Sequence, residues 1–265
     1  MGNKSTLVVY TNDNRMKVRD GRKTETRRVM SPAPSNEWSP YGGITEIHGR
    51  NQRGEFDHRI VKGYGFCNEE GDEGYVSPYG RPGDTLLLAE PVKFSSYNLD
   101  TRVATGIYLD DEEPFRVESA YIVKKLCMRK RPFAVTSARF MYKALARTRF
   151  VITDVRAERL QEITEEDALA EGVDPLFSYD EIHSPRYHAE LDLRPMPYQN
   201  YLWHGRRGIT GKQVDAWDYQ FSSYKTAVGS FSSLWESIYG TLGYGWKADP
   251  FVWVYSFERL QGVEG

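Results

Sequence analysis

The segment from Gly21 to Arg28 is the densest group of chemically active side chains in the sequence. It reads Gly-Arg-Lys-Thr-Glu-Thr-Arg-Arg, in which five of the eight residues are charged and four of those are basic. Lysine and arginine donate hydrogen bonds to phosphates, carboxylates and base edges, and the two threonines add hydroxyl groups. Two interpretations stay open. The segment is either an exposed strand with alternating charges or an anion or nucleotide site that includes Arg22, Arg27 and Arg28.

An acidic cluster at residues 162–171 is a second candidate. On a helix that begins at Thr164, Asp167 and Glu171 are four residues apart and share a face. Glu171 directly precedes Gly172, at the negative end of the helix dipole, where a carboxylate does not stabilise the helix. The cluster is therefore either an ordinary exposed acidic surface or one in which Glu171 has another role.

The stretch from Ala120 to Thr153 contains nine basic residues and no acidic one, with aromatic residues interleaved. Basic side chains neutralise phosphates, and aromatic rings stack on bases. A solvated face balanced by acidic residues elsewhere explains the pattern equally well. The candidates for contact with nucleic acid or substrate in this stretch are Lys124, Arg129 and Arg131.

Few and short elements must position these groups. Alternation and apolar runs predict strands at residues 7–10, 85–94, 147–159 and 251–257. Capping residues and glycines predict helices at residues 12–20 and 164–171, and a third that ends near residue 240. We expect a solvated turn at 110–113 and irregular insertions at about 31–82 and 174–228. Because the strands and helices do not alternate as βαβ units, the pattern favours an α+β fold with a small mixed or barrel-like sheet and rim helices.

Composition excludes several classes of protein. A net charge of −2 over 265 residues argues against a protein that coats nucleic acid by bulk attraction, although a local basic groove is allowed. No apolar run reaches the length of a membrane helix, so we predict no membrane partner. Two cysteines and the absence of an apolar signal region predict a cytoplasmic protein. The spacing of His183 and His188 is poor for one ion, and no phosphate-binding glycine motif is present, so we predict neither a metal nor a cofactor.

Four segments together carry a resemblance to a known family. Taken in order, Gly21–Arg28, Pro78–Asp84, Thr153–Ala168 and Trp246–Val254 resemble the ASCH domain, and in particular the larger ASCH-like proteins of bacteriophages and prophages. The segments are short and spread along the chain, from Gly21 to Val254, and the resemblance as a whole extends over about half of the chain.

The resemblance implies one PUA-like domain over residues 1–265, a small mixed β-barrel with short rim helices around a cleft, enlarged by the two insertions. Such domains bind RNA or modified nucleobases, and some are amidohydrolases that remove the acyl group from N4-acylated cytidine. Their catalytic lysine, threonine and glutamate correspond to Lys23, Thr26 and Glu171. Residues three apart in a regular strand point to opposite faces, so Lys23 and Thr26 converge only across a bend after Gly21 or a bulge.

Three functional hypotheses follow. The protein recognises a nucleobase or nucleic acid in an ASCH-type cleft, with amidohydrolase activity on an N-acylated pyrimidine nucleoside as its catalytic form. It is a non-catalytic protein that binds RNA or modified DNA. Or it is a phage accessory protein that acts on a host protein, in the cytoplasm of the host cell.

Overall fold

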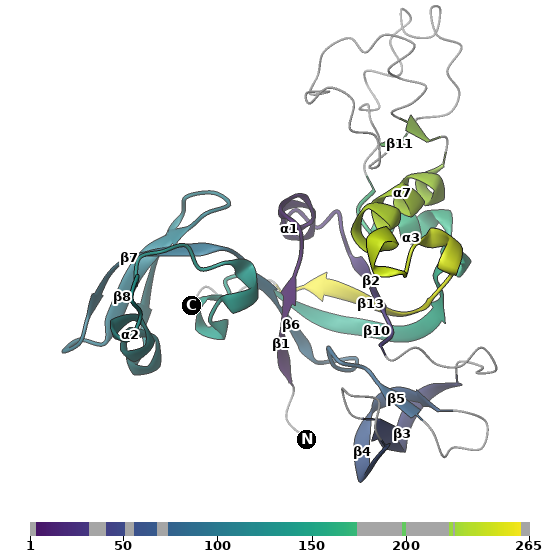
Figure 1. Cartoon of the computed structure of the whole chain (residues 1–265), viewed down its shortest axis with the longest axis horizontal. Coiled ribbons are helices and arrows are strands. Elements are labelled where there is room, and N and C mark those ends of the chain that lie inside the picture. The colour runs from purple at the N-terminus through teal and green to yellow at the C-terminus, as the bar shows by residue number, and fades with distance from the viewer. Residues whose placement is uncertain are drawn as a thin grey trace, which may run out of the picture. The chain divides into compact units, whose positions relative to one another are not determined.

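A computed structural model describes residues 4–31, 41–50, 56–67, 74–173, 198–199, 223–224 and 226–260. For residues 41–50, 56–67, 74–76, 199 and 223 the description is of the backbone only. Helices and strands are mixed along the chain, so the predicted α+β class is confirmed (Figure 1). No helix in these described ranges is long and apolar enough to cross a membrane.

The chain forms two compact units. Unit 1 comprises Met1–Gly21, Ser77–Asp154 and Phe257–Gly265, and unit 2 comprises Arg22–Val76 and Val155–Ser256. Two long strands, β10 (Arg149–Arg159) and β13 (Phe251–Arg259), each continue from one unit into the other. The single PUA-like domain stays a prediction.

The first layer of unit 1 is built on β6 (Thr85–Ala89), a strand of apolar residues buried on both faces. It pairs in parallel with β1 (Ser5–Val9) and antiparallel with the start of β10. After β1, helix α1 (Asn12–Arg19) begins at an N-cap threonine and ends before Gly21, which adopts φ +78°, a conformation that glycine tolerates best. The predicted strand and helix at the start of the chain are therefore confirmed.

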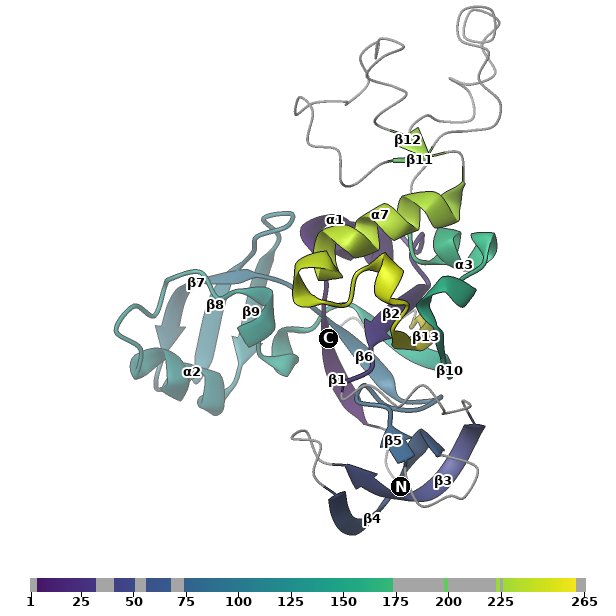
Figure 2. The ribbon, with the colours of Figure 1, turned by 45° about the vertical axis from the view of Figure 1, so that its right-hand side comes forward.

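The second layer of unit 1 is an antiparallel sheet covered by one helix. Its strands are β7 (Val92–Asn98), β8 (Val103–Tyr108) and β9 (Pro114–Glu118). Helix α2 (Ala120–Cys127) lies beside these strands in Figure 2 and contributes buried side chains to their core. Two short 3-10 helices, η1 (Ala138–Phe140) and η2 (Lys143–Leu145), add to the same core. Burial of this apolar face is what holds a short helix in place.

Unit 2 has β2 (Glu25–Val29) paired antiparallel with β13. Helices α3 (Glu165–Ala170) and α7 (Ala227–Tyr239) pack side by side (Figure 2), and the carboxylate of Glu165 accepts hydrogen bonds from the first backbone amides of α7. A negative charge at a helix N-terminus is stabilising. The remaining elements of unit 2 are short: η3 (Leu160–Glu162), β11 (Tyr198–Gln199), β12 (Ser223–Tyr224), η4 (Gly240–Leu242) and η5 (Trp246–Ala248).

Three expectations need correction. The region 31–82, predicted to be irregular, contains strands β3 (Tyr41–Arg50), β4 (Phe56–Cys67) and β5 (Gly74–Val76), which pair with one another. The glycine-rich sequence of this region shows no alternation of apolar and polar residues. Strands pair through backbone hydrogen bonds, which do not require that pattern. The single strand predicted at 85–94 is two strands, β6 and β7, separated by residues 90 and 91.

The third correction concerns the turn at 110–113. The turn forms, but Asp110 is not solvated, because Arg15 holds its buried carboxylate in two hydrogen bonds of 2.6 and 2.7 Å. The neighbouring Asp111 accepts hydrogen bonds from Arg19 and Arg147. Of the insertion predicted at 174–228, residues 198–199 and 223–224 pair as β11 and β12, and most of the rest, including His183 and His188, lies outside the described residues.

Candidate functional site

Strand β2 carries the second half of the predicted Gly21–Arg28 motif, from Glu25 onward, and divides its side chains between two faces. Its pairing with β13 runs without a bulge from Ser256 opposite Glu25 to Val252 opposite Val29. Because successive residues of a strand alternate, Glu25 and Arg27 share one face, and Thr26 lies on the other. Glu25, Thr26 and Arg27 are all buried.

Helix α3 brings the acidic cluster to the Glu25 and Arg27 face. Its N-cap Thr164 and Asp167 form a capping box, in which each side chain accepts a hydrogen bond from the other's backbone amide. The helix ends at Glu171, and Gly172 adopts φ +85°. The backbone amide of Thr24 donates to the carbonyl of Ala170 at 2.8 Å, which fixes the chain before β2 against the end of α3.

Lys23 and Glu171 form a buried ion pair. The Lys23 Nζ donates to the backbone carbonyl of Glu171 at 2.7 Å and to its carboxylate oxygen Oε2. The two side chains are only 2% and 5% exposed, so water cannot screen the pair. A cation at this carbonyl compensates the negative end of α3. A carboxylate at the C-terminal end of a helix is unfavourable, as the sequence indicated for Glu171. Lys23 neutralises that carboxylate.

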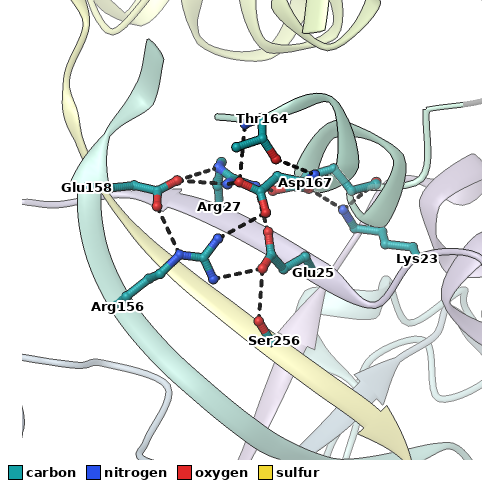
Figure 3. A network of polar contacts seen from close by, with 9 residues as sticks. Lys23, Glu25, Arg27, Arg156, Glu158, Thr164, Asp167 and Ser256 are labelled. Atoms are coloured by element: carbon teal, nitrogen blue, oxygen red, sulfur yellow. Dashed lines mark hydrogen bonds and ion pairs between the residues drawn. The ribbon is translucent and has the colours of Figure 1, made fainter. Parts of the chain in front are cut away.

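Arg27 is the centre of a network around this pair (Figure 3). Its guanidinium is completely buried and donates to Glu158 through Nε at 3.1 Å and Nη2 at 2.7 Å. It also donates to Asp167 Oδ2 at 3.0 Å and to Glu25 Oε2 at 2.8 Å. The fixed fork of donors on arginine suits this convergence of several carboxylates on one side chain.

Arg156, on β10, bridges the same carboxylates from a more exposed position. It donates to Glu25 Oε1 at 2.8 Å, to Glu158 Oε2 at 2.9 Å and to Asp167 Oδ1 at 3.3 Å. Ser256 on β13 donates a further hydrogen bond of 2.9 Å to Glu25 Oε1. Figure 3 shows these groups converging from β2, β10, β13 and α3.

The carboxylates of the network favour the charged form of its two arginines. Burial on its own lowers the pKa of the Arg27 guanidinium, but the charge of Glu171 and of two further carboxylates outweighs burial and raises that pKa. Burial likewise lowers the pKa of Arg156, but the hydrogen bond and the charge of Glu25, followed by those of Glu158, outweigh burial and raise that pKa. The network contains three cations, Lys23, Arg27 and Arg156, and four carboxylates, Glu25, Glu158, Asp167 and Glu171.

One carboxylate oxygen in this network accepts no hydrogen bond. Glu171 Oε1 is buried and has no hydrogen-bond partner among the described residues. Nη1 of Arg27 lies 3.6 Å from it, an ion-pair distance beyond the usual range of a hydrogen bond. A buried acceptor without a donor costs about 1–3 kcal/mol, so this oxygen is the least satisfied carboxylate oxygen of the network.

The structure brings together two of the three residues that the resemblance assigns to catalysis. Lys23 and Glu171 are in contact, but Thr26 lies on the face of β2 opposite Glu25 and Arg27, and β2 contains no bulge that would turn it. An ammonium that is bonded to a carboxylate must lose a proton before it acts as a base. This geometry suits binding and charge compensation better than nucleophilic attack by Thr26.

The predicted binding arginines of the motif fall in different environments. Arg22 is exposed, Arg28 is half-buried, and Arg27 is enclosed by the carboxylates of the network. Arg27 is therefore a structural cation rather than a ligand donor. Lys124, Arg129 and Arg131 belong to unit 1, where Lys124 and Arg131 are exposed, and Arg129 donates to Thr136 and Tyr142.

Sequence reasoning missed Glu25, Arg156, Glu158 and Ser256 as members of the site. A signal was present for three of them. Opposite charges recur two residues apart in the pairs Glu25 and Arg27, and Arg156 and Glu158, which places each pair on one face of its strand. Ser256 carries no such signal, because its role depends on the register between β13 and β2.

The described ranges contain no group of three or more His, Cys, Asp or Glu side chains that is arranged to hold a metal ion. Comparison of the chain with models of protein families, with curated proteins and with solved structures found no match. The ASCH resemblance rests on the four sequence segments alone.

Proposed function

We propose that unit 2 recognises a nucleobase through the Lys23 and Glu171 pair, in a site of the ASCH type on a PUA-like fold. The observation that carries the proposal is the buried Oε1 of Glu171, which accepts no hydrogen bond among the described residues. A carboxylate accepts a hydrogen bond from the exocyclic amine of cytosine, and a lysine ammonium donates to ring nitrogens or carbonyls. The pair therefore offers an acceptor and a cation side by side, which suits an aminopyrimidine.

Recognition without hydrolysis is the form of this function that the contacts favour. Hydrolysis of an N4-acylated cytidine by the resembled mechanism needs the Thr26 hydroxyl beside Lys23, whereas β2 directs Thr26 to the other face. Recognition needs no nucleophile, only the Lys23 ammonium and the Glu171 carboxylate, which are in contact with each other.

Calorimetric titration with cytidine and uridine tests the proposal. Uridine has a carbonyl oxygen where cytidine has its amine, so it places an acceptor against Glu171. We expect cytidine to bind more tightly, and Glu171→Gln to reduce that preference by about 1–3 kcal/mol, the value of one well-placed base contact. Glu166→Gln is the matched control, because Glu166 lies on the same helix and is exposed. Circular dichroism establishes that each variant is folded. Equal affinity for the two nucleosides, or a preference that survives in Glu171→Gln, would falsify the proposal.

Incubation with N4-acetylcytidine, followed by chromatography, separates recognition from catalysis. We expect no deacetylation above the level of Thr26→Ala. Turnover by the wild type that disappears in Thr26→Ala would establish the amidohydrolase hypothesis instead, because only catalysis requires that hydroxyl.

A further inference from the structure

Helix α2 in unit 1 has one buried and one open face. Ile122, Val123 and Leu126 are buried against the sheet of β7, β8 and β9. The remaining face is exposed and includes Tyr121 and Lys124 at helical spacing. Figure 2 shows α2 beside the sheet, with the rest of the helix surface uncovered within unit 1.

The open face carries an aromatic ring that is held in a fixed position. Tyr121 is 62% exposed, and its ring packs edge-on against that of Tyr142 with the centroids 6.0 Å apart. Tyr142 is itself anchored, because its ring contacts the buried Phe94 at 6.3 Å and its hydroxyl accepts a hydrogen bond of 3.2 Å from Arg129. A rigid exposed ring loses little conformational freedom when a flat group stacks on it.

Further aromatic rings are exposed in the segment after α2. Phe133 is 44% exposed and lies 6.0 Å from the ring of Tyr97, and Phe140 is 68% exposed. Phe133 and Phe140 belong to the same basic and aromatic stretch of sequence as Tyr121 and add exposed apolar surface to unit 1. The α2 surface is defined here as the exposed residues of 121–140 that are basic or aromatic: Tyr121, Lys124, Lys125, Lys130, Arg131, Phe133, Arg139 and Phe140.

The stretch of sequence that supplies the α2 surface carries basic residues and no acidic ones. No Asp or Glu occurs between residues 119 and 153. Lys125 lies 5.6 Å from the centre of the Tyr121 ring, so a cation and an aromatic face are presented together. By contrast, Arg147 is engaged by Glu90, Asp111 and Glu113 and belongs to a structural network rather than to this surface.

We propose that the α2 surface binds single-stranded nucleic acid. Phosphates complement the cations, and unpaired bases stack on the exposed rings, a combination typical of proteins that bind single strands with little sequence preference. A duplex encloses the faces of its bases and leaves the rings unused. An acidic protein segment would complement the lysines but would not account for rings held among them. The proposal is independent of the nucleobase site in unit 2, and the variants that test it leave Lys23 and Glu171 intact.

Fluorescence anisotropy with labelled oligo-U and oligo-dT of about 20 nucleotides, longer than one binding site, tests the proposal. Because the backbone charge is shared by RNA and DNA, tight binding of either oligomer supports it, and their relative affinity shows which nucleic acid is preferred. We expect Tyr121→Ala to weaken binding by at least about fivefold, the lower bound for loss of one stacked base, and Tyr121→Phe to retain wild-type affinity. Lys124→Gln should reduce the slope of log affinity against log salt by about 0.7, the value for one phosphate of a single strand.

Four results would overturn the proposal. The first is equal affinity for a duplex of the same length. The second is that Lys247→Gln weakens binding of the oligomers as much as Lys124→Gln does. Lys247 is the matched control, because it is an exposed lysine in unit 2. The third is binding to anionic lipid vesicles but not to either oligomer, which would assign the surface to a membrane instead. Binding of oligomers that Tyr121→Ala leaves unchanged would show that the rings take no part, and it also counts against the proposal.

Discussion

Replacement of Arg27 by methionine should destabilise the protein more than any surface substitution. Methionine has a similar volume and no charge, so the main loss is the guanidinium that four carboxylates face. Breaking a buried ion pair by removing one partner costs about 3–5 kcal/mol, because the remaining charges stay buried without compensation. A domain is stable by about 5–15 kcal/mol, so this loss is at least a fifth of the total.

The magnitude follows from the burial of the arginine. Arg27 is completely buried, whereas the side chain of Arg156, which contacts Glu25, Glu158 and Asp167, is 33% exposed. Water can partly replace Arg156 around those carboxylates but has no access to replace Arg27. We therefore expect Arg156→Met to cost less than Arg27→Met. Because the pKa of Arg27 is raised above its ordinary value, the contribution of its charge is fully present below that ordinary value and is lost only as pH rises through the folded-state pKa.

Urea denaturation followed by circular dichroism measures these differences at neutral pH. Arg116→Met is the matched control, because Arg116 also lies in a strand and is exposed, and its substitution should change the free energy of unfolding by no more than about 0.5 kcal/mol. A cost below about 1 kcal/mol for Arg27→Met, or equal costs for Arg27→Met and Arg156→Met, would refute the reasoning, since the median exposed ion pair contributes no more than that.

Three further predictions concern single groups whose partners are defined. Thr164→Ala should cost about 1 kcal/mol of stability through loss of the capping box of α3, and Thr164→Ser should cost much less; urea midpoints distinguish the two. Burial raises the pKa of the Tyr108 hydroxyl to about 12, and the group donates to the Leu145 carbonyl at 2.6 Å. Its contribution is full below pH 10, its ordinary pKa, and is lost as pH rises toward about 12, so the stability gap between wild type and Tyr108→Phe should shrink over that range in thermal melts. Burial alone would raise the pKa of Asp111, but hydrogen bonds from Arg147 and Arg19 outweigh burial and lower that pKa below 3.8. The difference in stability between wild type and Asp111→Asn should therefore persist above pH 3.8 and vanish as pH falls below it. A difference that stays constant with pH would contradict this assignment.

Local signals in the sequence predicted the boundaries of α3 well. Thr164 is its N-cap and Gly172 follows its end in a left-handed conformation, as expected from the capping preferences of these residues. Such signals act between neighbours in the chain, so one sequence is enough to read them. For the same reason β13 was predictable from its pattern of apolar residues.

Long-range pairing was not predictable in the same way. Arg27 and Glu158 are 131 residues apart, and Lys23 and Glu171 are 148 apart. Nothing in the local sequence shows that these charges neutralise each other, so the basic motif and the acidic cluster looked like separate surfaces. Strands β3, β4 and β5 were missed because their residues carry no sustained alternation, and their pairing partners are one another rather than a patterned core strand.

The two carboxylate oxygens of Glu171 differ in their hydrogen bonds, and this difference allows a structural role to be tested against a binding role. Oε2 is explained by the fold, because Lys23 binds it together with the carbonyl at the end of α3. Oε1 is explained only in part, since the charge of Arg27 at 3.6 Å stabilises it but no donor completes a hydrogen bond among the described residues. If Glu171 served the fold alone, Glu171→Gln would lower the free energy of unfolding and leave nucleoside preference absent in wild type and variant alike. If Oε1 accepts a nucleobase amine, the same substitution reduces a preference for cytidine that the folded wild type has. Denaturation and titration of one variant therefore decide between the two roles.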